Sequence, residues 1–204
     1  MEYQLNEIFC SLQGEGVWTG TPMVFIRLAG CSMGCKFCDT DLGENFRADE
    51  TEIIHRVKQY KKVRIVVLTG GEPLEQDCGT LIRLLHLEGY HVHLETNGFW
   101  KVPSSSMGEI PDWITVSPKS TDLDGEIIQL ADETKFLCGQ PGWVELIEEV
   151  MSVYSPYRAE RLWIMPVADG RQINWQNVEL AKAYCLANPD FSLCMQLHKI
   201  LKIP

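Results

Sequence analysis

The sequence predicts a single α/β domain built around a parallel sheet. Short apolar runs rich in β-branched residues alternate along the chain with longer amphipathic segments, which is the pattern of strands connected by helices. Strands connected in this way pair in parallel through crossover connections. The length of 204 residues, with no change of composition that would mark a linker, corresponds to one domain with a sizeable core.

The apolar runs predict seven strands. They are Val24–Leu28, Arg64–Leu68, His91–Glu95, Trp113–Val116, Thr134–Leu137, Arg161–Met165 and Leu193–Leu197. Segments between them have an apolar stripe at helical spacing, and these are Asp49–Tyr60, Leu74–Glu88, Trp143–Tyr154 and Asn174–Ala187. Their ends fit this assignment, because the first begins among acidic residues, the second stops at Gly89, and the last begins at a capping asparagine.

The charge and the first residues of the chain restrict its partners. A net charge of −10 repels phosphate backbones, so we expect no nucleic acid partner. The N-terminal residues include acids where a signal peptide has bases, and no apolar run approaches the roughly 18 residues of a membrane span. We therefore expect a cytoplasmic protein that does not bind a membrane.

Polar residues cluster at the carboxyl ends of the predicted strands. Three cysteines follow the strand that ends at Leu28, the sequence TGGEP follows Leu68, and ETNG follows Leu94. The sequence SPK follows Val116, and further polar residues follow Met165. This edge is where active sites are built in parallel sheets and barrels, so the pattern predicts one site there.

Cys31, Cys35 and Cys38 have the spacing C-x3-C-x2-C. Three thiolates leave one coordination position of a metal site open, and chemistry occurs at open positions. The spacing alone leaves two interpretations. A zinc site would recruit Cys10, Cys78 or a histidine as a distant fourth ligand, whereas three thiolates can hold a cubane iron–sulfur cluster with one iron free.

The sequence TGGEP is a weak signal alone, because two glycines after a strand are often only a tight turn. Its functional interpretation is that residues without a Cβ let the backbone approach a ligand. Glu72 would then accept hydrogen bonds from an ammonium group. Beside a loop with three thiolates, we favour this interpretation.

The sequences CSMGCKFC and TGGEP together resemble the radical S-adenosylmethionine (SAM) superfamily. This resemblance implies a partial (β/α) barrel, here of about six parallel strands, in which three cysteines hold a 4Fe–4S cluster. The nucleotide's methionine binds the free iron, and the GGE sequence meets its amino group. This cofactor would account for the open coordination position.

The sequences SLQGEG, CDT, VSPK and QLHKILKIP resemble, over essentially the whole chain, the 7-carboxy-7-deazaguanine synthase family. The resemblance implies a lyase of queuosine and deazapurine biosynthesis that acts on 6-carboxy-5,6,7,8-tetrahydropterin. A 5′-deoxyadenosyl radical would take a hydrogen from C6, and the ring would contract with loss of ammonia and with help from Mg²⁺.

The resemblance also implies roles for individual residues. The catalytic residues would be Cys31, Cys35 and Cys38 on the cluster and Thr40 on Mg²⁺. The nucleotide would contact Phe37, Cys38, Asp39, Gly71, Glu72, Glu95, Ser117, Pro118, Lys119, Pro166, Val167 and Ala168. The pterin would contact Leu12, Gln13, Gly14, Arg27, Thr69, His198 and the terminal carboxylate of Pro204.

Structural roles compete with several of these assignments. Thr40 could make only a turn hydrogen bond, Arg27 could belong to a structural ion pair, and Glu95 could have a structural partner. The chain reads MPVADG over residues 165–170, where the family is expected to read close to QPMDG. This departure leaves the contacts of that segment open.

The resemblance implies a homodimer and a flavodoxin or ferredoxin as electron donor. Two alternatives of other classes remain. A radical activase would use the same cysteine spacing to generate a glycyl radical on a partner protein. A non-catalytic zinc-binding domain would use the glycines only as turns.

Overall fold

A curved, nine-stranded sheet organises the computed structural model, which describes residues 1–102, 109–154 and 161–204. The strand order is β3-β1-β2-β4-β5-β6-β7-β8-β9. The strands are β1 (Glu2–Leu12), β2 (Pro22–Leu28), β3 (Phe46–Asp49), β4 (Ile65–Gly70), β5 (His91–Thr96), β6 (Trp113–Val116), β7 (Glu133–Cys138), β8 (Arg161–Pro166) and β9 (Phe191–Leu193). The helices are α1 (Glu50–Val57), the 3-10 turn η1 (Pro73–Glu75), α2 (Gly79–Leu87), α3 (Gly125–Leu130), α4 (Trp143–Val153), α5 (Trp175–Ala187) and α6 (Leu197–Leu201).

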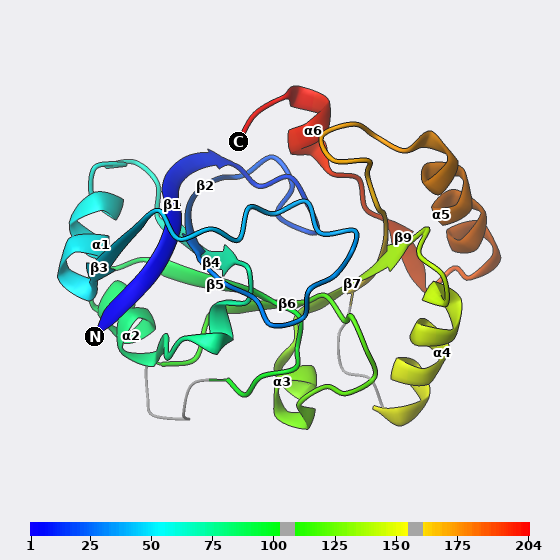
Figure 1. Cartoon of the computed structure of the whole chain (residues 1–204), viewed down its shortest axis with the longest axis horizontal. Helices are drawn as coiled ribbons and strands as arrows, with labels where there is room; N and C mark the ends of the chain where they lie inside the picture. The colour runs from blue at the N-terminus through cyan, green and yellow to red at the C-terminus, as the bar shows by residue number, and fades with distance from the viewer. Residues whose placement is uncertain (103–108, 155–160) are drawn as a thin grey trace.

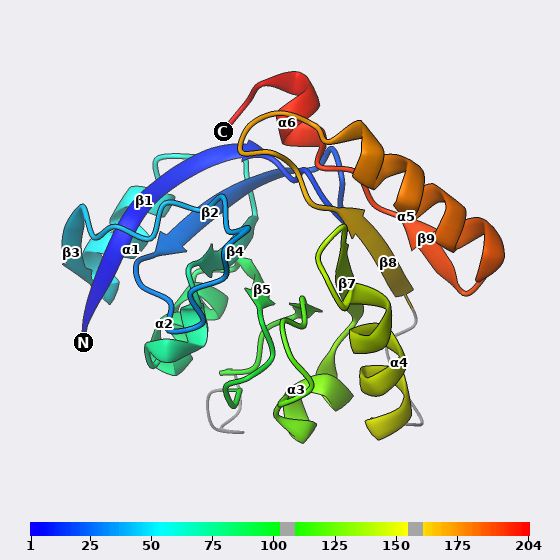
Figure 2. The same ribbon diagram turned by 45° about the vertical axis from the view of Figure 1, so that its right-hand side comes forward.

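The strands from β2 to β9 in this order, seven in all, pair in parallel, whereas β1 pairs antiparallel with both β2 and β3. The predicted parallel α/β architecture is therefore confirmed, with seven parallel strands rather than about six. Helices α1 to α5 lie around the outer side of the curved sheet, and α6 lies at its rim (Figures 1 and 2). None of the helices in the described ranges is long and apolar enough to cross a membrane.

The two faces of the sheet carry different side chains because residues alternate along each strand. Val66 and Leu68 belong to the large hydrophobic core that packs under the helices. Val67, between them, belongs to a small cluster with Met23 and Phe25 on the concave face. Thr69 continues this concave row, so the inner face becomes polar toward the carboxyl ends of the strands.

Two antiparallel strands, β1 and β3, were missed by the pattern of the sequence. The pairing of β1 with β2 shifts register between Leu5 and Glu7, which marks a β-bulge. The bulge changes which residues face the core, since Tyr3 and Leu5 precede it and Ile8 follows it. The strict alternation that identifies a strand is therefore broken in the middle of β1. Helix α3 is short and was also not predicted.

The predicted strand Leu193–Leu197 is wrong. The strand ends at Leu193, and Leu197 instead begins α6, where its amide donates to the Gly14 carbonyl at 2.8 Å. The predicted helix Leu74–Glu88 is also wrong in its first part. Gln76 is extended and its side-chain amide nitrogen donates to the carbonyls of Gln4 and Ala29, so the chain makes one 3-10 turn and starts a new helix at Gly79.

Candidate active site

The loop that follows β2 carries the three cysteines of the motif. Cys31 and Cys35 are half-buried and Cys38 is exposed, and all three are free thiols. The Cys38 amide donates to the Cys35 carbonyl at 3.1 Å, which closes a turn between them. The loop is held from outside by Glu75, whose Oε1 accepts bonds from the amide and hydroxyl of Ser32 at 2.8 and 2.6 Å.

The three thiols of this loop have the number and spacing that a cubane iron–sulfur cluster requires. Within residues 1–102, 109–154 and 161–204, no group of three or more His, Cys, Asp or Glu converges to hold one ion. In a cubane cluster each thiolate binds a different iron atom, so the three sulfur atoms do not have to meet at one metal ion, and one short loop can supply all of them. Cys78, a candidate fourth zinc ligand, is buried and its thiol donates to the Pro73 carbonyl at 3.3 Å.

The two glycines of TGGEP are required by packing against the cysteine loop. A Cβ on Gly70 would lie 2.1 Å from the Leu28 carbonyl oxygen, and one on Gly71 would lie 1.8 Å from that of Gly30. The Gly71 Cβ would also lie 3.0 Å from the Cys31 Cβ. These glycines therefore fix the position of the first cysteine, and the contact of Gly71 with a ligand stays a prediction.

Glu72 is buried, with 1% of its surface exposed. Its carboxylate accepts hydrogen bonds from the Thr96 hydroxyl at 2.7 Å, the Asn97 amide at 2.8 Å and the Leu74 amide at 3.0 Å. Burial raises the pKa of Glu72, and these hydrogen bonds offset only part of that effect. Glu72 therefore joins the TGGEP turn to the end of β5, and its contact with a methionine amino group stays a prediction.

A cavity of about 350 Å³ lies between the cysteine loop and the segment that follows β8. Phe37 and Asp39 line it on one side, and Val167 and Ala168 line it on the other. These four predicted nucleotide contacts, which are distant in sequence, are thus brought together. Asn177 on α5 fixes the segment, since its amide nitrogen donates to the Val167 carbonyl at 2.8 Å.

The predicted nucleotide residues Ser117, Pro118 and Lys119 follow β6 and are not among the described residues that line this cavity. The Lys119 ammonium donates to the carbonyl and the hydroxyl of Ser117 at 2.6 and 2.7 Å. Burial lowers the pKa of Lys119 to about 8. The SPK segment therefore holds a buried amine that is more easily deprotonated than an ordinary lysine but is still mostly protonated at pH 7.

Glu95 connects several of the residues predicted to bind substrate. Its Oε1 accepts a bond from the Gln13 side-chain amide at 3.0 Å, and its Oε2 accepts one from the Thr69 hydroxyl at 2.9 Å. His198 reaches the same region, because a Cβ on Gly14 would lie 2.2 Å from its Nδ1. Gln13, Gly14, Thr69 and His198 thus form one group, and Glu95 belongs to it rather than to the cavity described above.

A buried ion pair beneath this group was not predicted. The Lys135 ammonium on β7 lies 2.6 Å from the Glu15 carboxylate and 3.6 Å from that of Glu95. Burial alone would raise the pKa of Glu15, but the Lys135 charge, with bonds from Lys135 and Gln196, holds it well below its usual range. The sequence did contain a signal, since Lys135 interrupts an apolar run just as Arg27 does.

The remaining predicted residues lie beside this group or around it, since Arg27 pairs in register with Thr69 and Leu12 directly precedes Gln13. Arg27 donates from Nε to the Glu7 carboxylate at 2.9 Å and lies over the Phe9 ring, so the structural ion pair weighed for it exists. Pro204 is exposed, and its oxygen accepts a bond from the Ser11 hydroxyl at 2.9 Å. Leu12, which ends β1, is half-buried. Thr40 is half-buried two residues past Cys38, and its carbonyl lies 4.0 Å from the Cys38 sulfur.

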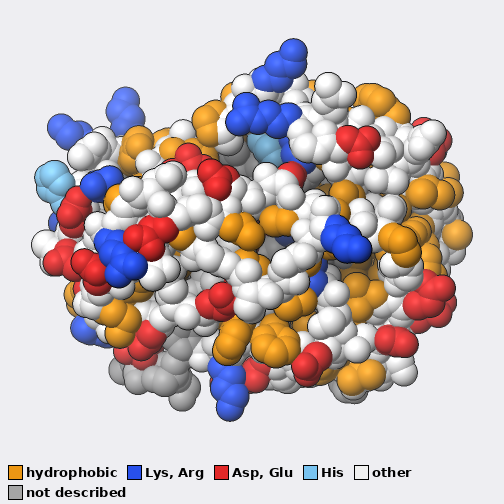
Figure 3. Space-filling model, in the orientation of Figure 1, with side chains coloured by type: hydrophobic (Ala, Val, Ile, Leu, Met, Phe, Trp, Pro, Cys, Tyr) orange, Lys and Arg blue, Asp and Glu red, His pale blue; other side chains and the backbone are white. Residues whose placement is uncertain are grey.

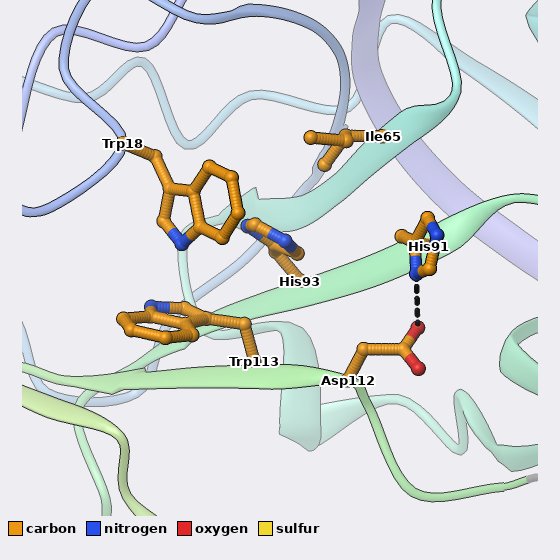
Figure 4. A pocket seen from close by; sticks show the side chains of 6 residues that line it. All are labelled: Trp18, Ile65, His91, His93, Asp112 and Trp113. Carbon is orange, nitrogen blue, oxygen red and sulfur yellow. Dashed lines mark ion pairs between the residues drawn. The ribbon is translucent and has the colours of Figure 1, made fainter.

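The opposite end of the concave face is closed by aromatic residues (Figure 4). Trp18, carried by the loop that contains Gln13, packs on His93 and Trp113 with ring centroids 5.1 and 5.6 Å apart. A cavity of about 190 Å³ is lined by Trp18, Ile65, His91, His93, Asp112 and Trp113. It contains no residue of the predicted site. Figure 3 shows the face that is seen in Figure 1, which is hollowed near its centre, with basic side chains above the hollow.

Comparisons with known proteins agree with this arrangement. The sequence model of the Radical SAM superfamily matches residues 25–154. The chain is 38% identical to 7-carboxy-7-deazaguanine synthase of Bacteroides thetaiotaomicron and 30% identical to that of Escherichia coli K12, with 100% of each chain covered in both cases. The crystal structure of QueE from Escherichia coli superposes with a TM-score of 0.81 at 27% identity, covering 97% of this chain and 95% of that one. The chain therefore belongs to the 7-carboxy-7-deazaguanine synthase family of the radical SAM superfamily.

Proposed function

We propose that this chain is a 7-carboxy-7-deazaguanine synthase, a lyase that acts on 6-carboxy-5,6,7,8-tetrahydropterin and releases ammonia. The observation that carries the proposal is the convergence, around one loop, of three free thiols, a lined cavity and a polar group on the concave face. The synthases that match over their full length support it.

Cys31, Cys35 and Cys38 would hold a 4Fe–4S cluster, and Phe37, Asp39, Val167 and Ala168 would border the nucleotide of SAM. When bound, these groups would supply the 5′-deoxyadenosyl radical that removes a hydrogen atom from C6 of the substrate. A radical of this kind reacts with most organic groups, so the protein has to hold the target carbon close and exclude water. The packed aromatic residues at the far end of the concave face support such exclusion.

The polar group on the concave face would position the pterin. Glu95 fixes the side chains of Gln13 and Thr69 by hydrogen bonds, so both are oriented before substrate arrives. Burial lowers the pKa of His198, which keeps its imidazole neutral at pH 7. A neutral imidazole can hydrogen-bond an uncharged ring without adding charge. Arg27 would bind the substrate carboxylate through its two terminal nitrogens.

Magnesium would be held in part by this chain. Thr40 supplies one hydroxyl oxygen, and oxygen is the donor that Mg²⁺ prefers. The ion usually keeps several waters and takes further oxygens from its substrate, so one protein hydroxyl fits it. Oxygens of the substrate carboxylate and several waters would provide the other ligands. We also expect a homodimer and reduction by a flavodoxin or ferredoxin.

An anaerobic assay tests the proposal. The reconstituted protein is mixed with SAM, a reductant and 6-carboxytetrahydropterin, and 5′-deoxyadenosine and 7-carboxy-7-deazaguanine are followed together. We expect both products in wild type, and neither in C38A, which should also lose iron. The matched control is C185A, at a half-buried cysteine on α5, which should retain activity. Formation of 5′-deoxyadenosine without the ring-contracted acid would contradict the assigned reaction but not the superfamily.

A further inference from the structure

Lys199 on α6 connects three segments that are far apart in sequence. Its ammonium forms an ion pair with Asp39, the residue after the last cysteine. It also donates to the Gly170 carbonyl at 2.8 Å. The Lys199 side chain is only 6% exposed. Asp39 and Gly170 both line the 350 Å³ cavity, so this lysine joins its two walls to α6.

The neighbouring residues of α6 contact the substrate side of the site. The Leu197 amide donates to the Gly14 carbonyl at 2.8 Å, and His198 lies against the Gly14 backbone. The side chain of Gln196 donates to Glu15 at 3.0 Å. One short helix therefore contacts the cavity through Lys199 and the predicted pterin residue Gly14 through Leu197 and His198, while Gln196, just before the helix, bonds to Glu15.

This arrangement makes the two sides interdependent. The Lys199 side chain is nearly buried while that of Asp39 is 36% exposed, so the pair is partly solvated, and losing one partner costs less than in a fully buried pair but still frees the lysine side chain. If Asp39 or Gly170 moved outward, Lys199 would lose its partners, and α6 would lose a contact that holds it over Gly14. Conversely, a ligand that holds both cavity walls favours the position of α6 seen here.

We propose that Lys199 is a positioning residue that couples the nucleotide cavity to the substrate group. Binding of the nucleotide between Asp39 and Gly170 stabilises α6 over Gly14, and pterin binding stabilises the cavity walls in return. Such coupling is reciprocal by thermodynamic necessity. The inference rests on the proposed function only in taking this cavity as the nucleotide site.

Hydrogen exchange on the anaerobically reconstituted protein tests this coupling without turnover. The probe is S-adenosylhomocysteine, which fills a nucleotide site but cannot react. In wild type, we expect slower exchange in residues 36–39 and 167–170, which line the cavity, and also in residues 197–203. In K199M, protection of the cavity residues should remain, while the ligand-induced protection of 197–203 falls by roughly tenfold or more.

Two variants serve as comparisons. K199R keeps a cation that can pair with Asp39 and should retain most of the remote protection. K202M changes an exposed lysine just after the same helix and should behave as wild type. If nucleotide protects 197–203 equally in K199M and wild type, or does not protect that segment in wild type, the coupling is refuted.

Steady-state kinetics give a second readout. K199M should raise KM for the pterin roughly tenfold and increase the ratio of 5′-deoxyadenosine to ring-contracted acid, whereas K199R should not. Adding D39N to K199M should change the KM for the pterin little further, since the pair is already broken, and any additional effect should fall on the affinity for SAM, because Asp39 lines the nucleotide cavity. If wild type makes no ring-contracted acid, the proposed function fails while the exchange result stands. If wild type makes it and K199M keeps wild-type KM and product ratio, the coupling alone fails.

Discussion

Substitution of Lys135 by methionine is expected to destabilise the fold strongly. The Lys135 side chain is 5% exposed and that of Glu15 is 14% exposed, so neither charge is well solvated. K135M would leave two carboxylates, Glu15 and Glu95, without the cation that neutralises them. Breaking a buried pair by removing one partner costs about 3–5 kcal/mol of unfolding free energy, and we expect K135M to fall in this range. E15Q should cost less, about 1–3 kcal/mol, because Lys135 keeps Glu95 as a partner.

The assay is anaerobic urea unfolding at pH 7.5, followed by tryptophan fluorescence. The control is K182M, which breaks an exposed pair with Glu179 on α5 and should cost under about 1 kcal/mol. The penalty of K135M should also depend on pH. In wild type the pKa of Glu15 is depressed, so its contribution is complete above the unfolded value near 4.3 and is lost below it. In K135M the Glu15 carboxyl is buried without a cation, so its pKa rises and it takes up a proton at a higher pH. Protonation removes the buried charge, so the difference in unfolding free energy between wild type and K135M should become smaller as the pH falls from 7.5 to 5.

Equal, small penalties for K135M, E15Q and K182M would refute this reasoning. A penalty for K135M that does not change with pH would refute the electrostatic part of it. In that case the lost packing of the lysine stem, rather than the stranded carboxylates, would account for the destabilisation.

Three further outcomes are expected. G71A should prevent stable incorporation of iron, because its Cβ would lie 1.8 Å from the Gly30 oxygen. The control is G125A, where no atom lies within 4 Å of the added Cβ, and its free energy of unfolding should be within about 0.5 kcal/mol of wild type. Iron content and urea unfolding are measured for both variants. Burial lowers the pKa of His93 to about 4, so the buried imidazole has to take up a proton in the folded state only at low pH. The free energy of unfolding of wild type should therefore fall by up to about 3 kcal/mol between pH 6.5 and pH 4. H93Q should lack this contribution when urea unfolding is measured across the same pH range. R27M should raise the KM for the pterin roughly 10- to 100-fold, which corresponds to the loss of one charge-assisted hydrogen bond. If the KM is unchanged, Arg27 serves only its ion pair with Glu7 and does not bind the substrate.

The sequence predicted those features that depend on local pattern. Six of the seven parallel strands, from Val24 to Met165, were identified from apolar runs, and the cysteine loop from its spacing. Strand β1 was missed because a bulge after Leu5 shifts its alternation, and no propensity marks where a bulge occurs. The helix predicted from Leu74 failed because Gln76 bonds to β1 and the end of β2, which are distant in sequence.

The site was predicted in the same uneven way. The residues around Cys38 were predicted because they belong to one short motif, whose spacing can be recognised without knowledge of the fold. The pair of Lys135 with Glu15 joins positions 120 residues apart, and only the folded sheet brings them together. The packing role of Gly71 was likewise hidden, because a glycine that admits a ligand and one that admits a neighbouring backbone look alike in sequence.

The contact between Lys199 and Asp39 has a consequence for the order of events during synthesis. The two residues are 160 positions apart. At translation rates of about 5–20 residues per second, the cysteine loop precedes Lys199 by roughly 8–30 s. During that interval the three thiols emerge before the helix whose Lys199 later pairs with Asp39 beside them. Iron delivered to the ribosome-bound chain would therefore meet an open loop, whereas iron delivered after release would meet one already fastened by Lys199.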